Sequence, residues 1–300
     1  MKATAALKEG FGMARRGRPA IWALFLVNLG VAAVAALPIY RGILQFTGHS
    51  LMSRQLASGL PVDWFIDFSR NSPGSLDRYA ALIAVLGILS IPLNAVLAGG
   101  VLGHLRQGGA PFSLAVFFQD TGRYGWRLIR LMFIGLVGYW IVFCAFKKGL
   151  DSHIMDASYD WQSDRTVFAL RLAINLVMIL GLCLVNLVMD YARVRLVLED
   201  GTSAVEAFLA SCGFAYRRFR KATMVYALPA LAGAALLGLY WLLIPWALIN
   251  SPGEVGAMGN FRAPLTVALL FLIQQAVMFG RYWFRVAGWA SEWAYYSTSQ

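Results

Sequence analysis

The chain has 300 residues, of which 59% are apolar and only 14% charged, and its mean hydropathy is +0.62. A soluble globular domain carries about 25% charged residues, so this composition excludes an ordinary soluble protein and indicates a membrane protein. The basic residues lie beside apolar segments rather than in a separate basic domain, so the net charge of +11 favours membrane topology and attraction to anionic lipid over nucleic-acid binding.

Six apolar runs are long enough to cross the hydrocarbon core, which takes about 20 helical residues. None alternates apolar and polar residues, so they favour transmembrane helices over a β-barrel. The expected fold class is an all-α integral membrane protein with a single membrane domain over 1–300 and six transmembrane helices. The runs lie near 20–40, 79–105, 128–147, 167–191, 222–249 and 263–284.

The first run also has features of a secretory signal peptide. Arg15 and Arg16 precede it, and Ala33-Val34-Ala35 places small residues at a possible cleavage site. The apolar stretch continues to Tyr40, which favours a retained first span over a cleaved leader.

The distribution of charge predicts the orientation. Of the 26 Lys and Arg, 17 lie in segments 1–19, 106–130, 192–221 and 281–300. An excess of Lys and Arg marks the cytoplasmic side, so both termini are expected to be cytoplasmic in a bacterial-type inner membrane.

A pattern of features recurs three times, over 1–108, 109–200 and 201–300. Each unit has a basic amphipathic stretch, an apolar span, a polar loop and a second span, so we expect three repeats of an interfacial helix plus a transmembrane hairpin. In the third unit Ser203 and Glu206 form a capping-box pattern that predicts the helix start. In the second unit the amphipathic stretch begins at Pro111 and precedes the span at 128. The first outer loop, about 41–78, is expected to form a short lid on the membrane.

Basic residues in these stretches are the candidate contacts for lipid headgroups, because cations at helix ends meet the anionic surface. They are Arg15, Arg16, Arg18, Arg123, Arg127, Arg217, Arg218, Arg220 and Lys221.

Polar groups inside apolar spans are candidate functional residues, because an unpartnered polar group is costly in hydrocarbon. Asn94, Asn186 and Gln274 occupy matching positions in the second span of each unit. They either converge on a pseudo-threefold axis and line a polar cavity, or each forms a hydrogen bond with a neighbouring helix. Asp190 and Arg193, one helical turn apart, are expected to form an ion pair at the cytoplasmic boundary.

Signatures of catalysis and of metal binding do not stand out. The sequence has no Walker loop, no Gly-x-Ser-x-Gly and no His-Glu-x-x-His. Asp156, Asp160 and Asp164 recur every four residues but make a weak cation site. Gly99-Gly100 does not form a phosphate loop, and we interpret it as a point of close helix approach. No enzyme activity, metal or cofactor is predicted.

One stretch resembles a known group of proteins. Val197–Phe208, with Ser211 and Arg217-Arg218 after it, is similar to an element of YciC-type bacterial inner-membrane proteins and of the membrane domain fused to some glycerophosphodiester phosphodiesterases. Leu97–Val101 and Gly108-Gly109 resemble the second span of the YciC-type proteins. The resemblance implies the fold and an inner-membrane location. It does not imply phosphodiesterase activity, because no hydrolase domain is present.

Three functions are compatible with this pattern. The first is a non-enzymatic scaffold or accessory subunit that contacts lipid and partner membrane proteins. The second is the transmembrane subunit of a transporter, for example an ATP-driven exporter with its ATPase on another chain, although transporters more often carry two related halves. The third is an intramembrane lipid-processing enzyme.

Overall fold

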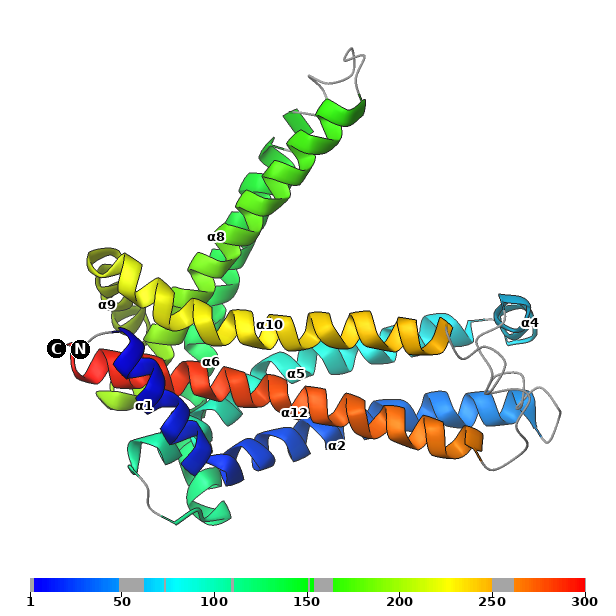
Figure 1. Cartoon of the computed structure of the whole chain (residues 1–300), viewed down its shortest axis with the longest axis horizontal. Coiled ribbons are helices and arrows are strands. Elements are labelled where there is room, and N and C mark those ends of the chain that lie inside the picture. The colour runs from blue at the N-terminus through cyan, green and yellow to red at the C-terminus, as the bar shows by residue number, and fades with distance from the viewer. Residues whose placement is uncertain are drawn as a thin grey trace. The chain divides into compact units, whose positions relative to one another are not determined.

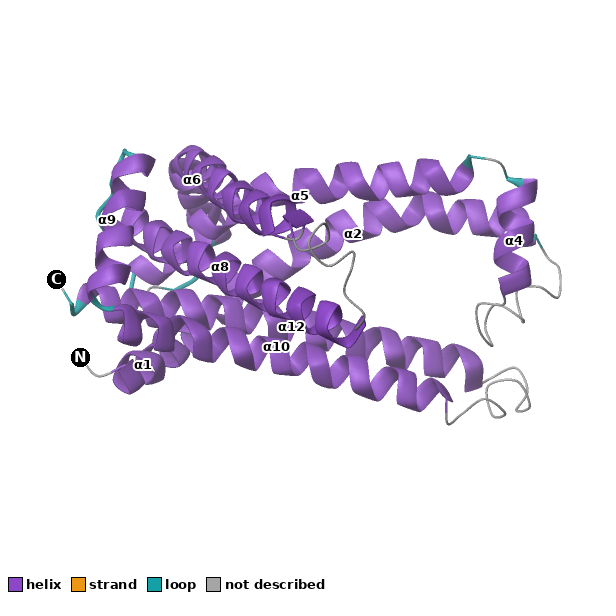
Figure 2. Cartoon of the chain, turned by 90° about the horizontal axis from the view of Figure 1, so that it is seen from above, coloured by secondary structure: helices purple, strands orange, loops and turns teal. Residues whose placement is uncertain are grey.

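The structure is a computed structural model that describes residues 3–48, 62–72, 74–108, 111–150, 152–153, 164–249 and 262–299. Every regular element within these ranges is a helix, and they contain no strand (Figure 2). The all-α class is therefore confirmed.

Five of the six predicted runs each lie within one long helix, and the third, 128–147, runs from an α-helix that ends at Phe143 into a π-helix that begins at Cys144 (Figure 1). Five helices in the described ranges are long and apolar enough to cross a membrane, namely α2, α5, α6, α8 and α10. A sixth crossing, through 263–284 of α12, stays a prediction. The helices are α1 (Ala3–Arg16), α2 (Arg18–Thr47), α4 (Val62–Asn71), α5 (Ser75–Arg106), α6 (Leu114–Phe143), the π-helix η1 (Cys144–Leu150), α8 (Asp164–Leu198), α9 (Ala204–Arg217), α10 (Phe219–Ile249) and α12 (Arg262–Ser297).

The chain divides into two compact units, and each is assembled from separate stretches of sequence. Unit 1 comprises Met1–Gly17, Ala95–Pro229 and Val286–Gln300, and unit 2 comprises Arg18–Asn94 and Ala230–Arg285. These bounds do not coincide with those of the three predicted repeats, and the threefold repeat remains a prediction.

Within unit 1, glycines allow helices to approach closely. A Cβ on Gly100 of α5 would lie 2.8 Å from the backbone oxygen of Phe117 in α6, so no larger residue fits without moving the backbone. This confirms the interpretation of the Gly99-Gly100 pair. A Cβ on Gly10 of α1 would lie 2.4 Å from the Ser291 backbone in α12. Small residues therefore bring α1 onto the C-terminal end of the chain.

The second amphipathic stretch differs from the prediction. A separate surface helix was expected before the span at 128, but α6 runs from Leu114 to Phe143 without a break. Phe117, Tyr124 and Leu128 are each at most 2% exposed and follow helical spacing. These residues pack on both sides of the expected junction, which favours one continuous helix over two. In contrast, α1 ends before Gly17, and α9 ends before Arg218.

Unit 2 is held by aromatic contacts and close approach. Phe279 of α12 lies 4.4 Å from Trp22 and 5.8 Å from Phe25 of α2, measured between ring centroids.

The loop in which a lid was expected contains the helix α4. Its Phe68 side chain is 3% exposed, and the Phe68 ring centroid lies 5.1 Å from that of Phe46. A helix in this loop is therefore observed, whereas its contact with a membrane stays a prediction.

We expect Gly100→Ala to lower stability by about 1–3 kcal/mol, because the added methyl group meets backbone that cannot move away. The matched control is Gly122→Ala on α6, where a Cβ meets nothing within 4 Å and the better helix former should be neutral or stabilising. Thermal unfolding of both variants in detergent micelles measures the difference. Equal midpoints would show that this helix crossing is not closely packed.

Candidate functional site

The helix α9 starts at the predicted cap and has an inverted distribution of side chains. The Ser203 Oγ accepts a hydrogen bond from the backbone N–H of Glu206 at 3.3 Å, which confirms the predicted start. α9 buries small residues and exposes larger apolar ones, the reverse of a surface helix in a soluble protein. The buried residues are Ala204, Ala207, Ser211 and Ala215, and the exposed ones are Val205, Leu209 and Tyr216, the last of which is 87% exposed.

Aromatic rings pack the C-terminal half of α9 against α8 and α12. The ring centroid of Phe214 lies 5.2 Å from that of Tyr191 in α8, 5.9 Å from Tyr295 and 5.0 Å from Tyr296 in α12. The Tyr296 hydroxyl donates a hydrogen bond to the Glu199 carboxylate at 2.8 Å. Because such aromatic contacts are directional, they fix where α9 ends.

A bend follows, and it gathers four cations. Arg218 leaves the helical conformation with φ −124° and ψ 30°, and its carbonyl accepts hydrogen bonds from the backbone N–H groups of Lys221 and Ala222 at the start of α10. A pocket of about 430 Å³ opens at this bend. We call Arg217, Arg218, Arg220 and Lys221 the basic corner; all four line the pocket, together with Tyr216, Phe219, Tyr295 and Ser299.

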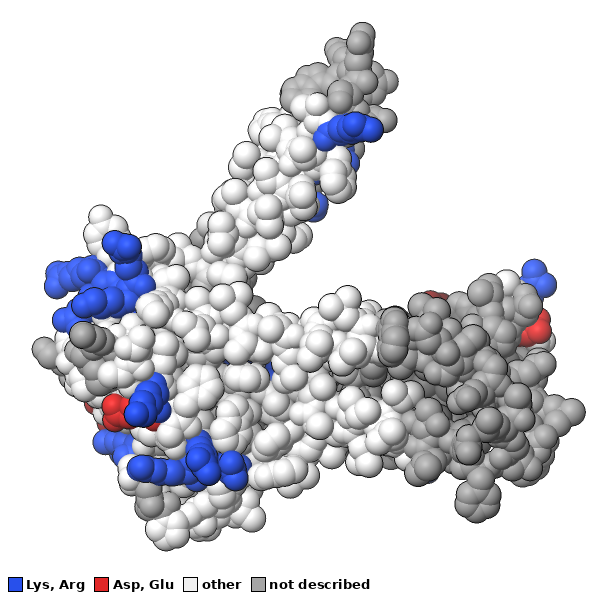
Figure 3. All heavy atoms as spheres, viewed as in Figure 1, with Lys and Arg blue, Asp and Glu red and all other residues white. Residues whose placement is uncertain are grey.

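Charge at the basic corner is not balanced locally. None of the residues that line the pocket is acidic, within the ranges that the structure describes. The space-filling view shows Lys and Arg gathered over α9 and the start of α10 with no acidic side chain among them on that face (Figure 3). An unbalanced group of cations in a concave site suits an anion such as a phosphate group.

A second cluster of arginines surrounds one aspartate. Arg127 donates to the Asp200 Oδ1 at 2.7 Å and to the Gly201 carbonyl at 3.1 Å. Arg123 forms a short contact with the Asp200 Oδ2, and Arg106 lies 3.9 Å from the same oxygen. Arg123 and Arg127, two of the expected headgroup contacts, therefore form ion pairs within the chain, across α6 and the end of α8.

Asp200, which binds these arginines, has a left-handed backbone conformation. Its φ is +53°, and the N–H of Gly201 donates to the Leu196 carbonyl at 3.0 Å, which closes the end of α8 as a Schellman motif. Glycine is preferred at this left-handed position, so an aspartate there is explained by its ion pairs. The hydrogen bond from Arg127 and the charge of Arg123 hold the pKa of Asp200 below its ordinary value, which keeps the carboxylate ionised.

The predicted pair of Asp190 and Arg193 is present, with 2.5 Å between the Asp190 Oδ1 and an Arg193 guanidinium nitrogen. The indole N–H of Trp289 donates to the same carboxylate oxygen at 3.2 Å. Asp190 is 7% exposed, so the pair is a buried junction between α8 and α12 within unit 1. No sequence pattern indicated Trp289, because its partner lies 99 positions away in the chain.

Two of the three span amides are hydrogen-bonded to neighbouring helices, as one of the two interpretations predicts. Asn94 exchanges two hydrogen bonds with Asn28, at 2.9 and 3.0 Å, and Asn186 accepts one from the Tyr139 hydroxyl at 2.8 Å. Gln274 is exposed, whereas its neighbour Gln275 lines an apolar cavity of about 510 Å³ in unit 2. Convergence of the three on one axis stays a prediction.

The remaining candidates lie in different surroundings. Arg16 lines a cavity in unit 1, Arg18 lies 5.4 Å from the ring of Trp283, and Arg15 is exposed. Of the three aspartates in the second loop, Asp156 and Asp160 lie outside the described residues. Among the described residues no cluster of three metal-ligating side chains occurs.

Comparison with protein families, curated proteins and solved structures finds no match to this chain. The five apolar helices place it in the class of all-helical, multi-pass membrane proteins.

We expect Asp200→Asn to destabilise the protein by about 1–2 kcal/mol at neutral pH, because asparagine tolerates the left-handed backbone but leaves the arginines without their carboxylate. The pKa of Asp200 is lowered in the folded state, so its contribution is present above the ordinary aspartate pKa and is lost as pH falls through the folded value. The difference between wild type and variant in thermal midpoint should therefore shrink below about pH 4.

The control is Glu206→Gln, an exposed acid on α9. If Glu206→Gln destabilised the protein as much as Asp200→Asn does, the role of the ion pairs would be contradicted. The same conclusion would follow if the difference in thermal midpoint between wild type and Asp200→Asn persisted at low pH.

Proposed function

We propose that the protein is a membrane-embedded scaffold or accessory subunit that holds anionic lipid at the basic corner. The main support comes from α9, which exposes large apolar side chains to its surroundings. At its C-terminal end, four cations line an open pocket. Such a helix suits the interface, where apolar residues enter the acyl region and Lys and Arg meet phosphate groups.

The same reasoning supports an orientation. Basic residues near the membrane stay cytoplasmic, so the basic corner is assigned to the cytoplasmic side together with both termini. We further propose six spans in three repeats and a bacterial-type inner membrane. The continuous α6 means that the second repeat would present its basic stretch in line with its span.

Neutralising the corner should weaken binding of anionic lipid. Each Lys or Arg near an anionic surface contributes about 1 kcal/mol, so the double variant Arg218→Gln/Lys221→Gln should lose about 30-fold in affinity for phosphatidylglycerol. Native mass spectrometry of the delipidated full-length protein, titrated with this lipid in neutral detergent, measures the affinity.

The matched control is Arg41→Gln/Arg70→Gln, which removes two exposed arginines of unit 2. Comparable loss in the control would show that net charge, rather than the corner, determines binding. Unchanged affinity in the corner variant would refute the proposed site.

The scaffold role also predicts a stoichiometric partner. Purification of the tagged chain in mild detergent, followed by mass determination of the intact complex, should give a species heavier than the chain with its lipids. If the chain is recovered alone and pure, the partner part of the proposal is wrong, while lipid binding remains separately testable.

A further inference from the structure

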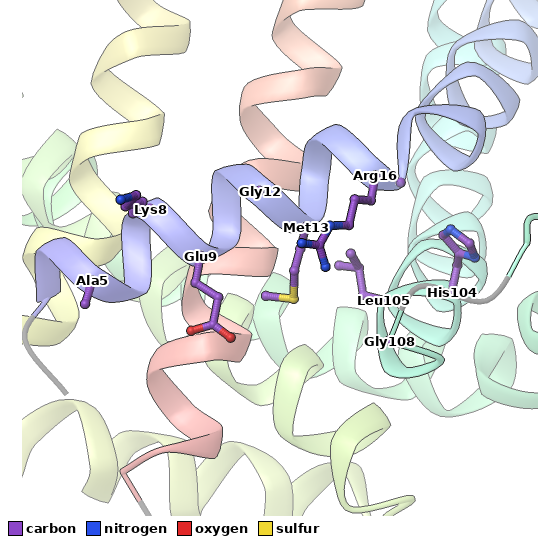
Figure 4. A pocket seen from close by; sticks show the side chains of 10 residues that line it. Ala5, Lys8, Glu9, Gly12, Met13, Arg16, His104, Leu105 and Gly108 are labelled. Carbon is purple, nitrogen blue, oxygen red and sulfur yellow. The ribbon is translucent and has the colours of Figure 1, made fainter.

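A second site lies under α1, within unit 1 and apart from the basic corner. Residues of α1 spaced three or four apart form one wall, and the C-terminal end of α5 forms the other (Figure 4). The cavity has a volume of about 690 Å³, enough for a phospholipid headgroup. Its lining residues are Ala5, Lys8, Glu9, Gly12, Met13 and Arg16 of α1, with Gly17, His104, Leu105 and Gly108.

Charges of both signs line this cavity. Lys8 and Arg16 supply two cations and Glu9 one anion, and none of the three forms an ion pair with another described residue. Glu9 and Arg16 extend from the same side of α1 with Met13 between them, and Arg16 and Met13 lie beside Leu105 of α5 (Figure 4). The C-terminal end of α5 adds the partial negative charge of a helix dipole.

The sequence positions of the lining residues indicate the depth of the site. Gly17 directly precedes the candidate span Arg18–Thr47, and Leu105 lies next to the last residue of the candidate span Ser75–Arg106. Both positions are boundaries between apolar and polar sequence, where headgroups lie in a bilayer.

We infer that this cavity binds a phosphate group joined by a short linker to a primary ammonium, as in the headgroup of phosphatidylethanolamine. Lys8 and Arg16 bind the phosphate, and Glu9 accepts hydrogen bonds from the ammonium. Quaternary ammonium groups are typically held by aromatic cages, and none of the described residues that line the cavity is Phe, Tyr or Trp. The site therefore selects ethanolamine over choline.

Gly12 allows the cavity to be filled without disturbing the fold. A Cβ built there meets nothing within 4 Å, and leucine is a better helix former than glycine. Gly12→Leu should therefore occupy the ligand space while α1 remains helical. Gly122→Leu is the matched control, since Gly122 is equally open and lies on α6 outside the lining.

The test is native mass spectrometry of the delipidated full-length protein with phosphatidylethanolamine and phosphatidylcholine titrated separately. We expect the wild type to bind the ethanolamine lipid about tenfold more tightly than the choline lipid. Gly12→Leu should lower affinity for the ethanolamine lipid at least tenfold, Glu9→Gln should abolish the preference, and Gly122→Leu should change neither.

Soluble glycerophosphoethanolamine separates the two sources of this headgroup. Affinity equal to that of the lipid identifies a site for the free compound, and much weaker affinity identifies a lipid site; both support the assigned chemistry. Equal affinity of the wild type for both lipids, or an affinity for phosphatidylethanolamine unchanged in both Gly12→Leu and Glu9→Gln, overturns it. Phosphatidylglycerol binding at the basic corner is an independent readout, so failure at one site is distinguishable from failure at the other.

Discussion

Hydrocarbon offers no hydrogen-bond partners to a polypeptide backbone, and most features of this chain follow from that constraint. Each apolar run forms a continuous helix that satisfies its own N–H and C=O groups. Large apolar side chains can then face lipid at no cost, and Ile88, Leu180 and Leu242 are accordingly between 66% and 74% exposed. Since burying large residues brings little advantage there, close contact depends on small ones, as at Gly10 and Gly100.

Polar interactions concentrate at the C-terminal end of α8, which serves as the centre of unit 1. Asp190 contacts Trp289 of α12, Glu199 contacts Tyr296 of the same helix, and Asp200 binds arginines of α6. Three acids on or beside one helix end therefore hold two other helices in place. Each is paired with at least one arginine, so the arginines at this junction have carboxylate partners within the chain. The contrast with the basic corner is informative, because there four cations surround a pocket whose described lining contains no acid.

The sequence predictions that were confirmed rested on the spacing of apolar residues and on interactions between residues close together in the chain. The apolar runs located the long helices, Ser203 located the start of α9, and the spacing of Asp190 and Arg193 indicated their contact. What the sequence did not reveal depends on residues distant along the chain. Asp200 was named only as part of the stretch Val197–Phe208, and nothing local shows that arginines more than 70 positions earlier bind it. The cavity under α1 likewise requires α5 to lie opposite, which no local pattern encodes.

The continuity of α6 shows how the same pattern leads to different local structures. The stretches before α2 and α10 end in a break, at Gly17 and Arg218, so the surface helix can turn away from the span. In α6 the corresponding stretch carries Arg123 and Arg127, which are bound by Asp200, and Tyr124, which is 1% exposed. A turn at this point would break these ion pairs and expose the tyrosine, so the helix continues without a break. The charges of this stretch are consequently used for assembly, whereas Lys8 and Arg16 of α1 and the four cations of the basic corner line pockets.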